Sequence, residues 1–113
     1  MATDLIEKVN QIRKKKLSEY SIEDLRLCIR QNISLDHLIP IAIEHLEKDI
    51  FVEGDLFEGD LLKSILDSDT AYWKTHLEQW NLIKKLYLKS KDTFDSDNIH
   101  RQIRQSFERF ENI

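Results

Sequence analysis

Glycine and proline are scarce in this sequence: two glycines and one proline occur in 113 residues, whereas together they average roughly 12% of soluble proteins. Since hairpins and tight strand connections depend on these residues, an all-β fold is disfavoured. The single cysteine, Cys28, cannot form an internal disulfide, which suits a reducing compartment. No long apolar run follows Met1, so the sequence shows neither a signal peptide nor a membrane span. These absences favour a cytoplasmic, helical protein.

The sequence nevertheless contains enough apolar residues to build a core. Hydrophobic residues make up 41% of the chain and charged residues 34%, which is typical of a folded protein. A chain of this length can fold as one domain, residues 1–113, without disulfides or metals. Apolar residues recur at helical spacing, which predicts an all-α fold, a compact single-domain bundle of five to six helices. The predicted helices lie at 4–16, after Ser21, after Ser34, after Asp60, at about 71–89 and at 99–110.

Short polar side chains predict where these helices begin. The predicted N-caps are Ser21, Ser34, Asp60, Thr70 and, for the last helix, Asp95 or Ser96. The basic run at 13–16 is expected to end the first helix, where it complements the negative end of the helix dipole. Pro40 falls inside an apolar stripe, so a kink or a local break is expected there. Residues 92–98 are polar and are expected to connect the last two helices.

The net charge is −4, but acidic residues are concentrated in the middle of the chain. Between positions 47 and 69 there are eight acidic residues and two lysines, a local charge of −6. Residues 1–30 and 70–113 each have a balance of +2. Binding to nucleic acid needs a basic footprint that neutralises phosphates, so this distribution disfavours it. A basic protein partner fits better, because complementary charge speeds and selects association.

The helical period stops between Asp49 and Asp60, where both glycines occur. They lie in two copies of one tripeptide, Glu-Gly-Asp, at 53–55 and 58–60. Glycine at both places predicts backbone conformations that other residues adopt poorly. Leu56 and Phe57 lie between the copies, so we expect the loop to be pinned to the core.

No motif for catalysis, cofactor binding or metal binding is present. The four histidines lack the spacing of metal ligands, and no phosphate loop, dinucleotide fingerprint or nucleophile elbow occurs. An EF-hand starting at Asp49 would place Gly54 correctly but would put Phe51 on a ligand position. Cys28 and the aromatic residues of the 71–89 stretch are expected to lie in the core, with an aromatic ligand slot as the alternative. The sequence therefore predicts a protein that is not an enzyme and holds no cofactor and no metal.

Several of these features resemble, in their order, a family of immunity proteins from bacterial contact-dependent growth inhibition (CDI) systems. The shared motifs are SIEDLRLCIRQNI at 21–33, LDHLIPIA at 35–42 and EGDLFEGDLL at 53–62, followed by Trp73. In that family a Leu- and Arg-rich helix with a Gln-Asn turn precedes a helix with an internal proline, a double Gly-Asp loop and a tryptophan. The resemblance covers a family-like core at about 18–75 and leaves 1–17 and 90–113 outside it.

The resemblance implies a cytoplasmic protein that binds and neutralises the toxic C-terminal domain of a large cell-surface effector. Such toxins are often nucleases with basic active-site clefts, which an acidic immunity protein can mask. The implied complex contains one copy of each partner and involves no nucleic acid and no membrane. The Gly-Asp and Leu-Leu residues shared with the family are then determinants of the fold, and the charged residues around them are candidate contacts. The partner-binding residues predicted from the local charge are Glu47, Asp49, Glu53, Asp55, Glu58, Asp67 and Asp69.

A second class of function stays open. The chain could be a helical adaptor or regulatory subunit that binds nucleic acid through its basic first helix, although the run at 13–16 lacks interleaved aromatic or glycine residues. A neighbouring gene for a large secreted effector would favour the immunity protein. Salt-sensitive binding of RNA by the chain alone would favour the adaptor.

Overall fold

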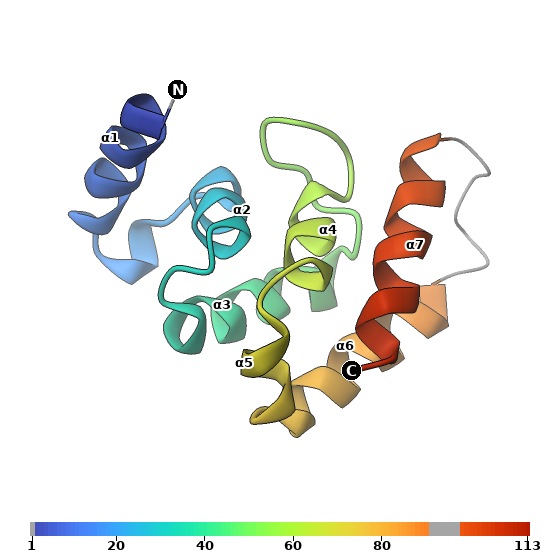
Figure 1. Ribbon diagram of the computed structural model, residues 1–113. Coiled ribbons are helices and arrows are strands. Elements are labelled where there is room, and N and C mark those ends of the chain that lie inside the picture. Colours follow the sequence, from blue (N-terminus) through green and yellow to red (C-terminus); the bar gives the residue numbers. More distant parts are fainter. Residues whose placement is uncertain (1, 91–97) are drawn as a thin grey trace.

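The computed structural model describes residues 2–90 and 98–113, which form seven α-helices and one short 3₁₀ helix (Figure 1). The α-helices are α1 (Ala2–Arg13), α2 (Ile22–Arg30), α3 (Leu35–Lys48), α4 (Asp60–Leu66), α5 (Thr70–Lys74), α6 (Leu77–Ser90) and α7 (Asn98–Glu111), and the 3₁₀ helix η1 spans Leu17–Glu19. Helices make up 74% of the described residues, which contain no strand. The all-α prediction is confirmed, whereas the predicted number of helices is too low.

Helix α4 lies at the centre of the molecule, between α2 on one side and α7 on the other (Figure 1). Helix α3 contacts α2, α4 and α6, and α1 packs against α2 at the outer edge. The buried apolar side chains form one core cluster, and the Cα radius of gyration is 13.7 Å. The largest fully buried side chains include Trp73, Phe110, Leu25, Ile29, Leu38 and Ile39.

The start of α2 confirms the cap predicted at Ser21. Ser21 Oγ accepts a hydrogen bond from the backbone N–H of Asp24 (3.0 Å), and Asp24 Oδ2 accepts one from the backbone N–H of Ser21 (3.0 Å). This capping box satisfies two backbone donors that a helix start leaves unpaired. Asp24 Oδ2 also accepts a hydrogen bond from Lys15 Nζ (2.7 Å). The basic run that follows α1 is thereby tied to α2.

The start of α3 differs from the prediction, although Ser34 does occupy the N-cap position. Its backbone is left-handed (φ 50°, ψ 41°), and its side chain makes no capping hydrogen bond. The helix then runs through Pro40 to Lys48, so the local break considered for this stretch does not occur. Pro40 and Asp36 are both exposed, so water can reach the Asp36 carbonyl that lacks its usual helical donor.

The single helix predicted at 71–89 is two helices, α5 and α6, separated at Thr75 and His76. The carbonyl oxygen of Tyr72 accepts hydrogen bonds from the backbone N–H of Thr75 (3.2 Å) and from Thr75 Oγ1 (3.0 Å), and it lies 2.7 Å from His76 Nδ1. These side chains satisfy a carbonyl that a continuing helix would have paired with the N–H of residue 76. The period of the apolar residues does not reveal such local competition, and this split accounts for the additional helix.

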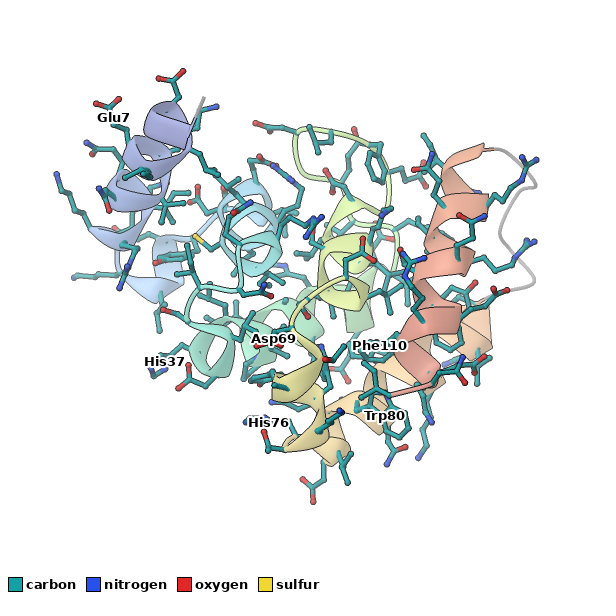
Figure 2. All side chains as sticks on the ribbon, viewed as in Figure 1. Glu7, His37, Asp69, His76, Trp80 and Phe110 are labelled. Carbon is teal, nitrogen blue, oxygen red and sulfur yellow. The ribbon has the colours of Figure 1, made fainter. Side chains whose placement is uncertain are left out.

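The cap of α5 is Asp69, and Thr70, the predicted cap, is the first residue of the helix. Asp69 Oδ1 accepts a hydrogen bond from the backbone N–H of Ala71 (3.1 Å). The backbone N–H of Asp69 in turn donates to Asn32 Oδ1 (2.8 Å), and Asn32 has a left-handed backbone (φ 59°). The turn before α5, labelled at Asp69 in Figure 2, is thereby joined to the turn between α2 and α3.

The aromatic residues of α5 and α6 pack into the core, as predicted. Trp73 is fully buried, and its Nε1 donates to Ser68 Oγ (2.9 Å). Trp80 Nε1 donates to the carbonyl oxygen of Phe110 (2.9 Å), and the two residues lie side by side in Figure 2. The Phe110 ring meets Trp73 edge-on, with 5.0 Å between ring centroids. These contacts fasten α7 to the core.

The N-caps predicted for the last helix fall outside the part of the chain that the structure describes. Asp95 and Ser96, the predicted caps, and nearly all of the polar connection at 92–98 lie outside the described residues. The helix itself spans Asn98–Glu111, close to the predicted 99–110.

Candidate partner-binding site

The acidic loop (residues 49–59) leaves α3, arches over one end of α4 and returns to the start of that helix (Figure 1). The backbone N–H of Gly59 donates to the carbonyl oxygen of Phe51 (3.0 Å), which joins the two sides of the loop. Asp49 Oδ1 accepts a hydrogen bond from the backbone N–H of Phe51 (2.9 Å). The base of the acidic loop is therefore closed by hydrogen bonds, and residues 52–58 form its tip.

The carboxylate of Asp60 holds the tip of the loop from below. Asp60 is 1% exposed; its Oδ1 accepts a hydrogen bond from the backbone N–H of Gly54 (2.7 Å), and its Oδ2 accepts from those of Leu56 (3.0 Å) and Phe57 (3.3 Å). Arg26 Nε lies 3.9 Å from Asp60 Oδ2 and offsets the buried charge. The predicted N-cap role of Asp60 is wrong: Gly59 is the N-cap, and the Asp60 side chain reaches back to the loop.

Glu23 holds the loop from the side of α2. Glu23 Oε1 accepts hydrogen bonds from Arg26 Nε (2.6 Å) and from the backbone N–H of Asp55 (2.9 Å). Its Oε2 accepts a further one from Arg26 Nη2, which makes the ion pair bidentate. The hydrogen bonds from Arg26 hold the pKa of Glu23 below its usual value, against the opposing effect of burial. Four consecutive backbone N–H groups, those of residues 54–57, thus donate to two carboxylates.

The two glycines of the loop are required for different reasons. Gly59 has a left-handed backbone (φ +88°), as predicted, and a Cβ there would lie 2.9 Å from Ile103 Cδ1 of α7. Gly54 has no positive φ, so the predicted special conformation is absent there. A Cβ on Gly54 would instead lie 2.7 Å from Glu23 Oε1, so a side chain there would displace the carboxylate that holds the loop.

Leu56 and Phe57, the apolar residues between the two Glu-Gly-Asp tripeptides, differ in their exposure. Phe57 is half-buried, whereas Leu56 is 62% exposed. The expectation that both residues pin the loop is therefore wrong for Leu56. Hydrogen bonds from the backbone to Asp60 and Glu23 fix the loop without its help.

The predicted partner-binding carboxylates fall into two groups. Six are on exposed residues, at the end of α3, in the acidic loop and at the cap of α5: Glu47, Asp49, Glu53, Asp55, Glu58 and Asp69. The seventh, Asp67, is only 13% exposed at its side chain and pairs with Lys63 Nζ (2.6 Å) and Arg109 Nη2 (3.4 Å). Hydrogen bonds from Lys63 and Ser106 hold its pKa below the usual value although burial acts in the other direction. Asp67 thus links α4 to α7 inside the fold.

Two grooves lined by opposite charges adjoin the acidic loop. The acidic groove, of about 600 Å³, lies between α1, α2 and the loop. Its charged lining residues are Asp4, Glu7, Lys8, Glu23, Asp24 and Asp55. The basic groove, of about 150 Å³, lies between α2, α4 and the loop. It is lined by Leu56 and Phe57, by the cations Arg26, Arg30 and Lys63, and by the internally paired carboxylates Asp60 and Asp67.

The loop and the helices that hold it occupy the part of the chain on which the family comparison rests. A sequence model of the CDI immunity proteins matches residues 1–86. The chain belongs to the CDI immunity proteins. The match begins before the motif-bearing stretch at 18–75, so α1 lies within it and α7 lies beyond it. No curated protein and no solved structure matched the chain.

The cysteine of this CDI immunity protein takes part in the fold. Cys28 is fully buried, and burial raises the pKa of its thiol, so it is the predicted core residue. In the described parts of the chain, no group of three or more His, Cys, Asp and Glu side chains is placed to hold a metal ion. None of the helices seen in residues 2–90 and 98–113 combines the length and apolarity that crossing a bilayer requires.

Sequence reasoning missed the grooves and the anchoring role of two carboxylates. The acidic groove brings together Glu7 of α1, Glu23 of α2 and Asp55 of the loop, which are far apart in the sequence. No local sequence pattern predicts that these three residues lie close together. The repeated Glu-Gly-Asp tripeptide does indicate a structured loop. The sequence of this immunity protein does not show, however, which of the two aspartates is buried and holds the loop.

Proposed function

We propose that this chain binds the toxic C-terminal domain of a CDI effector through the acidic loop and thereby neutralises it. The observation that carries the proposal is a loop with a fixed backbone, three exposed carboxylates and no basic residue between Glu53 and Asp60, in a member of the CDI immunity family. Of the other predicted contact residues, Glu47 and Asp49 lie at the end of α3, beside the base of the loop, and Asp69 lies at the cap of α5, beyond the end of α4 opposite to the loop.

The chemistry of the loop fits a toxin that acts on nucleic acid. A nuclease needs a basic cleft to hold phosphates, and exposed carboxylates on a hydrogen-bonded loop are complementary to such a cleft. Steering by opposite charge can raise association rates from ~10⁵–10⁶ to ~10⁸ M⁻¹s⁻¹ at low salt. Covering the cleft would exclude the substrate. The immunity protein would act in the cytoplasm, as one copy bound to one toxin domain.

The alternative, an adaptor that binds nucleic acid through α1, has less support. Lys15 of the basic run is paired with Asp24, and the side of α1 that faces the acidic groove carries Asp4 and Glu7 beside a single lysine, Lys8. Carboxylates beside a phosphate chain repel it. Retention of RNA by the purified chain alone, lost on raising the salt concentration, would favour the adaptor.

The proposal is tested with the C-terminal domain of the large effector encoded beside the gene for this chain. We expect co-expression of the immunity protein to rescue growth and to abolish cleavage of RNA or DNA by that domain at a one-to-one ratio. A triple variant, Glu53→Lys, Asp55→Lys and Glu58→Lys, should slow association and weaken protection, with an unchanged helical spectrum.

A matched triple variant controls for net charge. Glu44→Lys, Glu78→Lys and Glu111→Lys change the charge equally at exposed positions on α3, α6 and α7, and we expect nearly unchanged binding. If both triples bind at the same rate and with the same dependence on salt, the acidic loop is not the binding site. If the wild-type chain neither binds nor protects, the proposed function is wrong.

A further inference from the structure

The tip of the acidic loop presents Leu56 to solvent on a backbone that is already fixed. The backbone N–H groups of residues 54–57 all donate to the carboxylates of Asp60 and Glu23. Those hydrogen bonds point inward, and Leu56 is the most exposed large apolar side chain among the described residues, at 62%. Two carboxylates with limited exposure are thus used to hold a leucine outside the core.

Single exposed leucines are common and need no explanation by themselves. Leu56 differs from those on α6 because its loop has no helical backbone to fix it and is ordered by the carboxylates of Asp60 and Glu23 instead. A contact residue that is ordered before binding loses little conformational entropy when it binds. An apolar centre surrounded by polar groups is also the usual arrangement of a protein–protein interface.

The charge around Leu56 changes sign from one side of the loop to the other. Toward α1, Asp55 borders the acidic groove, which has five carboxylates and one lysine among its charged lining residues. Toward α4, Leu56 borders the basic groove with Arg30. Arg30 is exposed and forms no ion pair with any other described residue, whereas Arg26 and Lys63 are paired internally. A partner that covers Leu56 therefore meets negative charge on one side and positive charge on the other.

We infer that Leu56 is the apolar anchor of the toxin interface and enters a pocket on the toxin domain. That pocket has a Lys or Arg at the edge facing the acidic groove and an Asp or Glu at the edge facing Arg30. The apolar contact provides affinity, and the two opposite charges fix the orientation of the toxin on the loop. The inference rests on the proposed function and adds the contact that holds the two proteins together.

The experiment measures binding of the same effector C-terminal domain to single variants of the full chain. We expect Leu56→Ala to weaken binding by at least tenfold, mainly through faster dissociation. Leu88→Ala is the matched control, because Leu88 is also exposed (47%) but lies on α6. The affinity of this variant for the toxin domain should stay within twofold of that of the wild type. Both variants should keep the helical spectrum and the unfolding midpoint of the wild type.

Arg30 tests the orientation. Arg30→Glu should weaken binding about tenfold, and Arg101→Glu, the same change at an exposed site on α7, should weaken it less than twofold. If the wild type binds and Leu56→Ala binds equally well, the anchor is wrong and the proposed function stands. A loss at Leu56 without one at Arg30 would overturn the orientation. Absence of binding by the wild type would overturn the proposed function itself.

Discussion

Asp55 and Asp60 hold the same place in two copies of one tripeptide, yet their side chains have opposite environments. Asp55 is exposed and uses its backbone N–H to bind Glu23, whereas Asp60 is buried and accepts three backbone hydrogen bonds. The difference arises because Asp60 opens α4 directly beneath the loop. The repeated sequence thus supplies one residue that can contact a partner and one that shapes the loop.

Replacing Asp60 with asparagine is expected to lower the free energy of unfolding by about 2–4 kcal/mol. The carboxamide has a single oxygen, so it cannot replace both carboxylate oxygens that accept from the loop, and the charge that offsets Arg26 is lost. Urea unfolding measures the change. Asp55→Asn, at an exposed side chain, is the control and should stay within about 0.5 kcal/mol of the wild type. Equal stability of the two variants would contradict the anchoring role.

Gly59→Ala is expected to destabilise the fold by about 1–3 kcal/mol, and Gly59→Val by more. Two effects add: the positive φ of Gly59 and the 2.9 Å approach of a Cβ to Ile103 Cδ1. They can be separated, because Ile103→Val removes that methyl group at a cost of about 0.5–1.5 kcal/mol. The double variant should be more stable than the sum of the single effects predicts. Strict additivity would show that backbone strain alone explains the loss.

At the scale of elements, α7 lies beyond the family match but supplies a large share of the core. Ile103, Phe107 and Phe110 are buried, and α7 packs along α4. It also pairs with α4 through Arg109 and Asp67. The part of the chain shared with the family therefore depends on a helix that the family match does not include.

Phe110→Ala is expected to lower the free energy of unfolding by about 3–5 kcal/mol. The ring packs edge-on against Trp73, and the carbonyl of Phe110 receives the Trp80 indole N–H, so tryptophan fluorescence reports the change directly. Gln105→Ala, at an exposed position of the same helix, is the control and should change stability by no more than about 0.5 kcal/mol. If Phe110→Ala unfolded at the same midpoint as the wild type, α7 would not be needed for the stability of the core.

Helices with a clear apolar stripe could be predicted from the sequence, because burial follows the helical period. The cap at Ser21 could be predicted as well, because a capping box is local. The break at Thr75 and His76 could not, since it depends on two side chains competing for one carbonyl. Asp67 pairs with Arg109, which is distant in the sequence, so this contact could not be predicted either. The same holds for the candidate site. Its charged residues could be predicted from the sequence, whereas its long-range hydrogen bonds could not.

At the scale of the whole molecule, three paired carboxylates make the fold sensitive to acid. Glu23, Asp24 and Asp67 each have a pKa held below the usual value by hydrogen bonds from basic partners or from the backbone. A carboxyl group whose pKa is lower in the folded state stabilises the fold above its unfolded pKa, and that contribution is lost as the pH falls through the folded pKa. These three groups therefore favour the folded state at neutral pH.

We expect these groups to leave the free energy of unfolding unchanged between pH 7 and about pH 5. At pH values below about 4 the free energy of unfolding should decrease, because the unfolded chain takes up protons first. Urea unfolding at pH 7, 5 and 3.5 measures the trend. Asp67→Asn should start less stable than the wild type and should lose less on acidification. A stability that rises between pH 5 and pH 3.5 would contradict the assignment.

The exposure of Leu56 has a consequence for the molecule before it meets any partner. An apolar side chain on a rigid, solvent-facing loop is a point at which copies of the chain could adhere to one another. Within the loop itself, Glu53, Asp55 and Glu58 flank Leu56 with negative charge, and Arg30 lies beyond the loop on one side. Two copies that approach loop tip to loop tip therefore meet like charges and repel each other. The carboxylates thus act as gatekeepers against self-association. The same residues that would attract a basic partner would keep the unbound protein monomeric and able to bind.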